Sequence, residues 1–222
     1  MIPPSHNAAF VAAMEDILEL YLRPFDEKIP LVCMDEQPVQ LVSEVRTPLP
    51  ARPGRPRRYD QHYERAGTAN IFLFTEPLAG WRRASVTERR TAVDWAEQMR
   101  ILLEEDYSDA QRVILVCDNL NTHAVASFYK AFPPAVARDL ARRIEIHYTP
   151  KHGSWLNVAE CELSVLTRQC LRNRTPTIGD LRGKVGPWQR ERNGRTRTVD
   201  WHFTTEDARI RLKRLYPQYQ AA

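Results

Sequence analysis

Apolar residues in the first part of the chain follow two different periods and predict one helix followed by strands. Between residues 7 and 22 they recur every three or four positions, and Asn7 precedes the run as a candidate N-cap. The stripe consists of Phe10, Met14, Ile17, Leu18 and Tyr21. Shorter apolar runs with the length of strands follow at 31–36, 39–45, 69–77 and, after a turn, within 78–87.

Further along the chain, helical and strand patterns alternate. A helical pattern runs from Thr87 or Thr91 to Glu105, and Thr91 can form a capping box with Asp94. The run at 112–117 is apolar almost throughout, which is typical of a buried strand in the parallel part of a sheet. The remaining predicted elements are a helical segment at 123–142 interrupted by two prolines, strands at 144–150 and 198–203, and helices at 153–171 and from 204 onward.

This order of elements predicts an α/β fold. Early strands that can pair as hairpins, followed by alternating helices and strands, form a mixed sheet with helices on its faces. A single domain is the simplest account of 222 residues, and the order is also that of a ribonuclease-H-like fold. The tract at 47–58 cannot be a central strand, because its four prolines have no N–H to donate.

Charge is distributed unevenly along the chain. Lys and Arg number 32 against 28 Asp and Glu, a modest excess. The tract at 47–58 nevertheless carries four arginines and no acid, and 181–198 carries six basic residues against one Glu. Local basic patches of this kind favour a polyanionic partner.

The cysteines and the apolar runs argue against several other classes of protein. The four cysteines form no C-x-x-C pair and lie in apolar segments, so we expect buried reduced thiols and no zinc site or disulfide framework. No apolar run approaches the ~20 residues that span a bilayer. The first residues lack the basic and apolar regions of a secretion signal. A cytoplasmic protein is therefore expected.

Three acids stand where a metal site can form. Asp35 ends the first predicted strand, Asp118 follows the buried strand, and Glu160 lies one turn into the helix at 153–171. Ligands of α/β sheets bind just beyond the strand ends. Carboxylates there could hold Mg²⁺, which takes oxygen ligands, and two such ions can drive phosphodiester cleavage. For each acid alone a solvated turn residue is the simpler interpretation, whereas the three together, beside basic tracts, favour a metal site.

The residues around these acids resemble the catalytic core of the DDE transposases, in the bacterial insertion-sequence branch of the mariner superfamily. That family carries an Asp in a D-E strand motif, a second Asp in D-N-x-x-x-H and a third acid in S-x-x-L-N-x-x-E or a close relative. The matching stretches are CMDE, CDNLNTH and SWLNVAE, which contain Asp35, Asp118 and Glu160. The resemblance covers about residues 5–217 and rests on the three motifs occurring in this order.

The resemblance implies a domain organisation, a reaction and partners. A ribonuclease-H-like DDE catalytic domain is expected at 29–217, with the basic insertion 47–58, after an N-terminal helix and linker at 1–28. The implied enzyme is a cut-and-paste transposase whose three acids hold two Mg²⁺ or Mn²⁺ ions. It hydrolyses phosphodiesters at transposon ends and joins the freed 3′-hydroxyl to target DNA. The implied partners are double-stranded DNA and a second copy of the chain, in the bacterial cytoplasm and on the nucleoid.

Two features depart from the family pattern. Between Asp118 and Glu160 lie 41 residues, more than is usual in the mariner relatives, and the segment at 131–143 is where the extra length is expected. Family members also carry helix-turn-helix modules ahead of the core, which read the transposon ends. This sequence reaches the core almost directly, so sequence-specific end recognition is not expected of it alone.

Five further residues are candidate supports for the site. Asn157 lies one turn before Glu160 and could brace its carboxylate or touch DNA, and it is equally a candidate N-cap. Lys151 and His152 precede the helix and could meet a scissile phosphate or form a plain exposed loop. After Asp118, His123 could contact phosphate or water, and Asn121 could order the loop or cap the next helix.

Three neighbours of the motifs are given structural roles. Glu36 points to the face of its strand opposite Asp35, so a solvated or supporting role is expected. Glu162 lies about 200° round the helix from Glu160 and is expected on the surface. Trp155 is expected in the core.

The arginines of the 47–58 tract have two interpretations. Such a charged run is by default a solvated loop. Its prolines, however, stiffen it into an extended arm, and arginines without acids gain from phosphate contacts and counterion release. In the mariner relatives the corresponding insertion is a clamp used in dimer assembly, so the resemblance favours a DNA or partner contact. The candidate DNA-binding residues are Arg52, Arg55, Arg57 and Arg58.

Two other functions share the same three acids. The chain could be a non-catalytic DNA-binding or assembly module, which pairs with a full-length transposase and inhibits it. It could also be a stand-alone nuclease that cleaves generic duplex or hybrid substrates without strand transfer.

Overall fold

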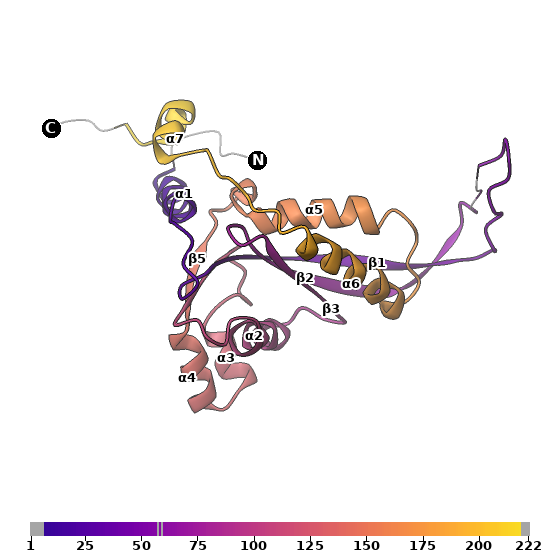
Figure 1. The fold of residues 1–222 in the computed structure, drawn as a ribbon, viewed down its shortest axis with the longest axis horizontal. Helices are drawn as coiled ribbons and strands as arrows, with labels where there is room; N and C mark the ends of the chain where they lie inside the picture. The colour runs from indigo at the N-terminus through magenta and orange to yellow at the C-terminus, as the bar shows by residue number, and fades with distance from the viewer. Residues whose placement is uncertain (1–6, 57, 59, 219–222) are drawn as a thin grey trace.

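The strands form one five-stranded mixed sheet in the order β3-β2-β1-β4-β5 (Figure 1). The computed structural model describes residues 7–56, 58 and 60–218. Strands β1, β2 and β3 are antiparallel neighbours, whereas β4 and β5 run parallel to β1. This is the mixed α/β sheet that the sequence predicts. The strands are β1 (Leu31–Glu44), β2 (Tyr63–Glu76), β3 (Trp81–Thr87), β4 (Val113–Cys117) and β5 (Ile144–Tyr148).

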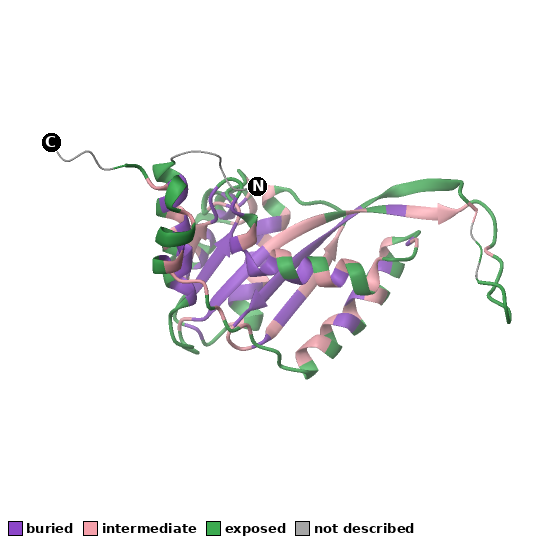
Figure 2. Ribbon diagram, turned by 90° about the horizontal axis from the view of Figure 1, so that it is seen from above, coloured by how far each residue is buried: buried purple, intermediate pink, exposed green. Residues whose placement is uncertain are grey.

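Helices cover both faces of the sheet and bury a separate core on each (Figure 2). On one face lie α1 (Ala8–Tyr21), α5 (Val158–Cys170), α6 (Ile178–Gly194) and α7 (Thr205–Arg211), with the short η2 (Ser154–Leu156) and η3 (Lys213–Leu215). On the other lie α2 (Ala92–Ile101), its π-helical continuation η1 (Leu102–Asp106), α3 (Ala126–Ala131) and α4 (Pro134–Arg142). Alternate residues of one strand enter the two cores, as with Cys33 and Met34 of β1.

The caps predicted for α1 and α2 are present, and α7 also begins with a capping box. The side chain of Asn7 accepts a hydrogen bond from the backbone N–H of Phe10 at the start of α1. Thr91 and Asp94 form the capping box of α2, and Thr204 and Asp207 form that of α7. The segment of extra length between the second and third acids forms α4 and its connections.

The sheet differs from the prediction in its first two strands. The runs 31–36 and 39–45 form one strand, β1, and β2 begins at Tyr63, six residues before the predicted start. Pro38 is accommodated within β1 because β1 pairs with β4 only from Leu31 to Cys33, so the edge beyond Cys33 lacks a strand partner. The exposed start of β2 has no apolar pattern and is held by its ladder with β1.

Two elements near the C-terminus also differ. Helix α6 was missed because glycines and Pro187 lower its helix propensity, yet Leu181, Val185 and Trp188 pack one side of it into the core. The strand expected at 198–203 is wrong, since this segment crosses the fold without a ladder. Its contacts include one backbone hydrogen bond from Val199 to Pro77 and a tilted ring contact of Trp201 with Tyr21, with the ring centroids 4.6 Å apart.

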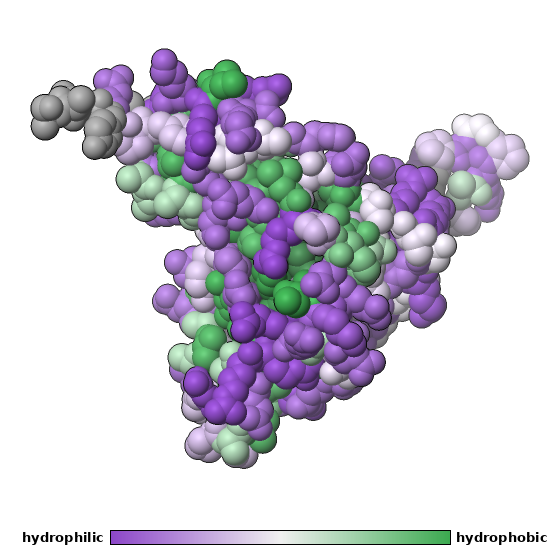
Figure 3. Space-filling view, turned by 60° about the vertical axis from the view of Figure 1, so that its left-hand side comes forward, coloured by the Kyte–Doolittle hydropathy of each residue, from purple (hydrophilic) through white to green (hydrophobic). Residues whose placement is uncertain are grey.

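The tract between β1 and β2 extends away from the body of the molecule as an arm (Figures 1 and 3). Isolated bridges join Leu49 to Arg58 and Arg52 to Arg55, so the tract folds back on itself as a small hairpin. Figure 3 also shows apolar side chains gathered in the middle of the visible face, with hydrophilic ones around them. None of the described helices is long and apolar enough to span a membrane.

Candidate active site

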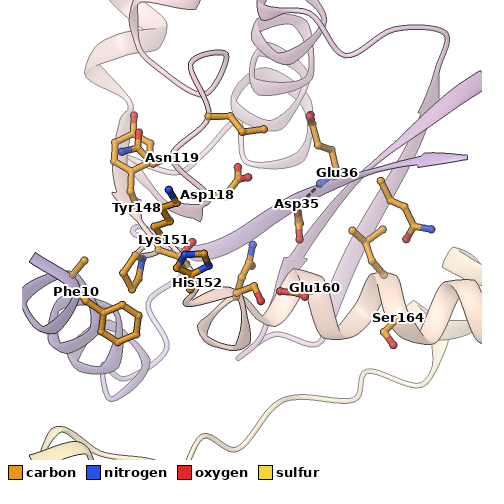
Figure 4. A pocket seen from close by; sticks show the side chains of 18 of the residues that line it. Phe10, Asp35, Glu36, Asp118, Asn119, Tyr148, Lys151, His152, Glu160 and Ser164 are labelled. Carbon is orange, nitrogen blue, oxygen red and sulfur yellow. Dashed lines mark hydrogen bonds between the residues drawn. The ribbon is translucent and has the colours of Figure 1, made fainter. Parts of the chain in front are cut away.

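The three predicted acids line one cavity of about 1040 Å³ (Figure 4). Asp35 lies on β1 just past its pairing with β4, and Asp118 is the first residue after β4. Because β1 and β4 are parallel neighbours, the carboxyl ends of their paired segments lie side by side, and both acids follow these ends. Glu160 enters from the first turn of α5. The opposite wall is formed by Lys151 and His152, both exposed, and by residues of α1.

Asp35 is the most perturbed carboxyl of the site. Burial, together with the negative charges of Asp118, Glu160 and Glu36, raises its pKa to about 7, although the N–H of Glu36 donates to its Oδ1 at 2.7 Å. Because burial and the neighbouring carboxylates disfavour the ionised form of Asp35, a nearby positive charge would stabilise it.

The raised pKa of Asp35 predicts a pH dependence of stability in EDTA. Between pH 3.8, the ordinary pKa of an Asp side chain, and about pH 7, Asp35 is protonated in the folded protein but ionised in the unfolded chain. The contribution of this group to the free energy of unfolding therefore falls as pH rises from 4 to 7. Urea unfolding at pH 5 and pH 8 should show that Asp35→Asn gains stability relative to wild type at the higher pH. An equal difference at both pH values would contradict the shift.

Asp118 is held by a buried histidine. Nδ1 of His123 lies 2.6 Å from Oδ1 of Asp118, and Nε2 lies 3.5 Å from Oε2 of Glu36. Burial lowers the pKa of His123, but its contacts with Asp118, Cys117 and Glu36 outweigh burial and raise the pKa to about 12. The ring stacks on Trp95 and is fully buried. His123 does not line the cavity, and its contacts are with Asp118, Glu36 and Trp95 instead of the phosphate or water that was expected.

Asn121 does not cap the following helix. Its side chain is exposed and lies outside the cavity, and α3 begins after Val125 without a side-chain cap. The turn that contains Asn121 is closed by a backbone hydrogen bond from His123 to Leu120.

Asn157 ties the helix of Glu160 to the strand of Asp35. Its Oδ1 accepts from the N–H of Ala159 as the N-cap of α5, and its Nδ2 donates to the carbonyl of Met34 at 2.9 Å. The N-cap alternative is thus confirmed, and the second hydrogen bond of Asn157 goes to the backbone of β1 instead of the carboxylate of Glu160. Asn157 is buried, and this fixes the distance between β1 and the first turn of α5.

The donors present fit a hard divalent cation. Oε2 of Glu160 is buried and has no hydrogen-bond partner among the described residues. Such an oxygen is costly unless a cation or water satisfies it. Within the described ranges no three Asp, Glu, His or Cys side chains form a ready ligand set. The three acids that line the cavity supply carboxylate oxygens, the ligand type that such a cation takes.

The side chains of Glu36 and Glu162 are both buried, whereas Glu36 was expected to be solvated or supporting and Glu162 to lie on the surface. Glu36 turns to the face opposite Asp35 and contacts His123 and Arg90, which agrees with a supporting role. Glu162 lies between Arg82 and Arg192, with N–O distances of 2.7 to 3.1 Å, so its predicted surface position is wrong. Helical geometry placed it opposite Glu160 correctly, but that face is covered by β3 and α6.

Two further expectations concern Trp155 and the cysteines. Trp155 packs against the core beside Phe203, as predicted. Cys33 and Cys117 are buried free thiols, whereas Cys161 is exposed and Cys170 is half-buried, contrary to the expectation that all four are buried.

The three candidate DNA-binding arginines that the structure describes lie away from the cavity. Arg52, Arg55 and Arg58 are exposed on the arm, and Arg57 lies outside the described residues. None of the described residues of the arm lines the cavity, so any contact they make is separate from the acids.

A mixed sheet that carries one acid on the central strand β1, one directly after its parallel neighbour β4 and one on the flanking helix α5 defines the class: a ribonuclease-H-like nuclease fold. Residues 30–182 match the family model of the DDE superfamily endonucleases, and the chain belongs to this family. A search of curated proteins finds no match.

Solved structures of a mariner transposase share the fold. The Mos1 transposase paired-end complex with left transposon end superposes with a TM-score of 0.61 at 16% identity, over 97% of this chain and 66% of that one. The Mos1 mariner paired-end complexes with Mn and with Mg each give 0.59 at 17% identity. This chain therefore spans slightly less than two thirds of the Mos1 chain.

Proposed function

We propose that this chain is the catalytic domain of a DNA transposase that hydrolyses phosphodiesters at transposon ends and joins the freed 3′-hydroxyl to target DNA. The observation that carries the proposal is the meeting of Asp35, Asp118 and Glu160 in one cavity. Membership of the DDE endonucleases supports it. The fold shared with Mos1, whose structures include transposon-end and strand-transfer complexes, supports it as well.

The proposed cofactor is a pair of Mg²⁺ or Mn²⁺ ions held by the three acids. When bound, such ions lower the pKa of a water molecule and neutralise charge on the phosphate oxygens. Asp35 must be deprotonated to act as a ligand, so metal binding competes with the proton that its raised pKa retains. His123 keeps the carboxylate of Asp118 in one orientation, and Asn157 keeps Glu160 near Asp35.

Lys151 and His152 are proposed to receive the substrate phosphate. Both are exposed at the wall of the cavity, and the neighbouring Asn119 and Tyr148 also line it (Figure 4). A lysine there supplies positive charge to a phosphate without occupying a metal-ligand position. The proposed assembly is a homodimer on double-stranded DNA, with the arginine arm as a contact to DNA or to the second copy.

The proposal is tested by incubating the chain with supercoiled plasmid and with a labelled oligonucleotide that ends in a 3′-hydroxyl. We expect nicked plasmid in Mg²⁺ or Mn²⁺, none in EDTA, and covalent joining of the label to the plasmid. Nicking without joining would indicate a stand-alone nuclease. Plasmid binding without nicking in either metal would indicate a non-catalytic module and would overturn the proposed activity.

A further inference from the structure

One edge of β1 is open next to the acids. Pairing with β4 ends at Cys33, and the next backbone contact on this edge is the hydrogen bond from Val42 to the carbonyl of Thr175. On this edge the side chain of Asn157 hydrogen-bonds to the backbone at one point, the carbonyl of Met34. Between these points Gln37 and Pro38 line the same cavity as Asp35, so the cavity continues along the edge in the direction of the arm.

An arginine stands beside this edge on the side of α5. Glu160, Ser164 and Arg168 are spaced four residues apart and therefore share one face of the helix. Ser164 lines the cavity, and the exposed Arg168 reaches back to donate from Nη1 to its Oγ at 2.6 Å. The guanidinium is thus held at the rim of the cavity, and its remaining N–H groups, which have no hydrogen-bond partner among residues 7–56, 58 and 60–218, can meet an anion.

A second arginine stands on the other face of the same strand. Nη1 of Arg90 lies 3.2 Å from Oε1 of Glu36, and the Arg90 side chain is 47% exposed. Because successive β1 residues point to opposite faces, Glu36 and Asp35 place Arg90 and the catalytic cavity on the two sides of one strand. Arg168 is anchored by Ser164 and Arg90 by Glu36, and both arginines keep solvent-exposed surface.

The spacing suits a nucleic-acid backbone. Ser164, to which Arg168 is bonded, lies about 6 Å along the helix axis from Glu160. One strand of duplex DNA advances about 3.4 Å per nucleotide, so this separation corresponds to about two nucleotides. A phosphate held at the acids would therefore have a neighbour in the same strand within reach of Arg168.

We infer that the DNA strand carrying the scissile phosphate leaves the acids along the open edge of β1, with Arg168 and Arg90 holding its next phosphates from either side. This path rests on the proposed function, and it assigns substrate-positioning roles to two residues outside the acid motifs. The arm lies beyond the same end of the edge (Figure 1), so the path also connects the cavity with the arm's exposed arginines.

The test measures how salt weakens binding of a fluorescein-labelled random duplex in EDTA, between about 50 and 200 mM NaCl. Each lost phosphate contact should reduce the slope of log affinity against log salt by about 0.9. We expect this reduction in Arg168→Ala and in Arg90→Ala. The matched control is Arg142→Ala on α4, whose side chain is 67% exposed and pairs only loosely, at 3.6 Å, with Asp139. It should retain the wild-type slope.

A wild-type slope in either folded variant overturns the role of that arginine, and an equal reduction in Arg142→Ala overturns the path. Plasmid nicking separates this inference from the proposed function. Arg168→Ala should raise the DNA concentration for half-maximal nicking and leave the maximal rate near wild type. If wild type nicks and the slopes do not change, the path fails and the function stands. If the slopes change and wild type does not nick, the path stands and the activity fails.

Discussion

Replacing Asp118 with Asn is expected to reduce metal-dependent plasmid nicking by at least about 10²-fold, because the amide cannot supply the negative charge that a divalent cation requires. Asp118 lies in the cavity with Asp35 and Glu160, and its carboxylate is oriented by His123 at 2.6 Å. The substitution keeps the size of the side chain. The loss should therefore appear in the maximal rate and in Mn²⁺ affinity measured by calorimetry.

The control for this substitution is Asp139→Asn on α4. Its side chain is 76% exposed and lies outside the cavity, so nicking should remain at the wild-type rate. Thermal unfolding should be recorded for both variants, since Asp118→Asn also removes the partner of a buried, protonated histidine. Full nicking by a folded Asp118→Asn protein would remove the basis of the proposed site.

Replacing Glu162 with Ala is expected to lower the free energy of unfolding by about 3–5 kcal/mol, because it leaves two arginines without their shared carboxylate. Glu162 and Arg82 have side chains that are 8% and 2% exposed, and Arg192 is 16% exposed. Arg82 also donates to the carbonyls of Gly80 and Arg197, so it cannot turn outward without losing these bonds. For a chain of this length the melting temperature should fall by roughly 6–20 °C.

The matched control is Glu191→Ala on α6, which removes the exposed carboxylate that pairs with Arg195. That ion pair has side chains that are 64% and 53% exposed, so its loss should change the free energy of unfolding by less than about 1 kcal/mol. Urea unfolding of the two variants compares a buried carboxylate with a solvated one. Equal effects would show that the Arg82–Glu162–Arg192 network does not stabilise the fold.

Periodicity and capping chemistry predicted most of the elements that bury one face. The stripe of α1, the capping boxes of α2 and α7, and the buried strand β4 all follow from residue type and local spacing. The exposed start of β2 and the glycine-containing α6 do not, because their stability comes from a partner strand and from a packed core. Local propensity does not depend on contacts with segments that are distant in the sequence, so it does not predict them.

The candidate site likewise has features that the sequence predicts and features that only the tertiary structure decides. The sequence by itself determined which carboxylates are available and that Asp118 ends a buried strand, because motifs and apolar runs are local features. Asp35, which was expected to end a strand, lies within the long strand β1. Only the tertiary structure decided that β1 and β4 are parallel neighbours, that His123 is a buried support for Asp118, and that Glu162 is enclosed by two arginines. Burial and charge pairing depend on which distant segments cover a side chain, and that is settled when the two cores form on the faces of the sheet.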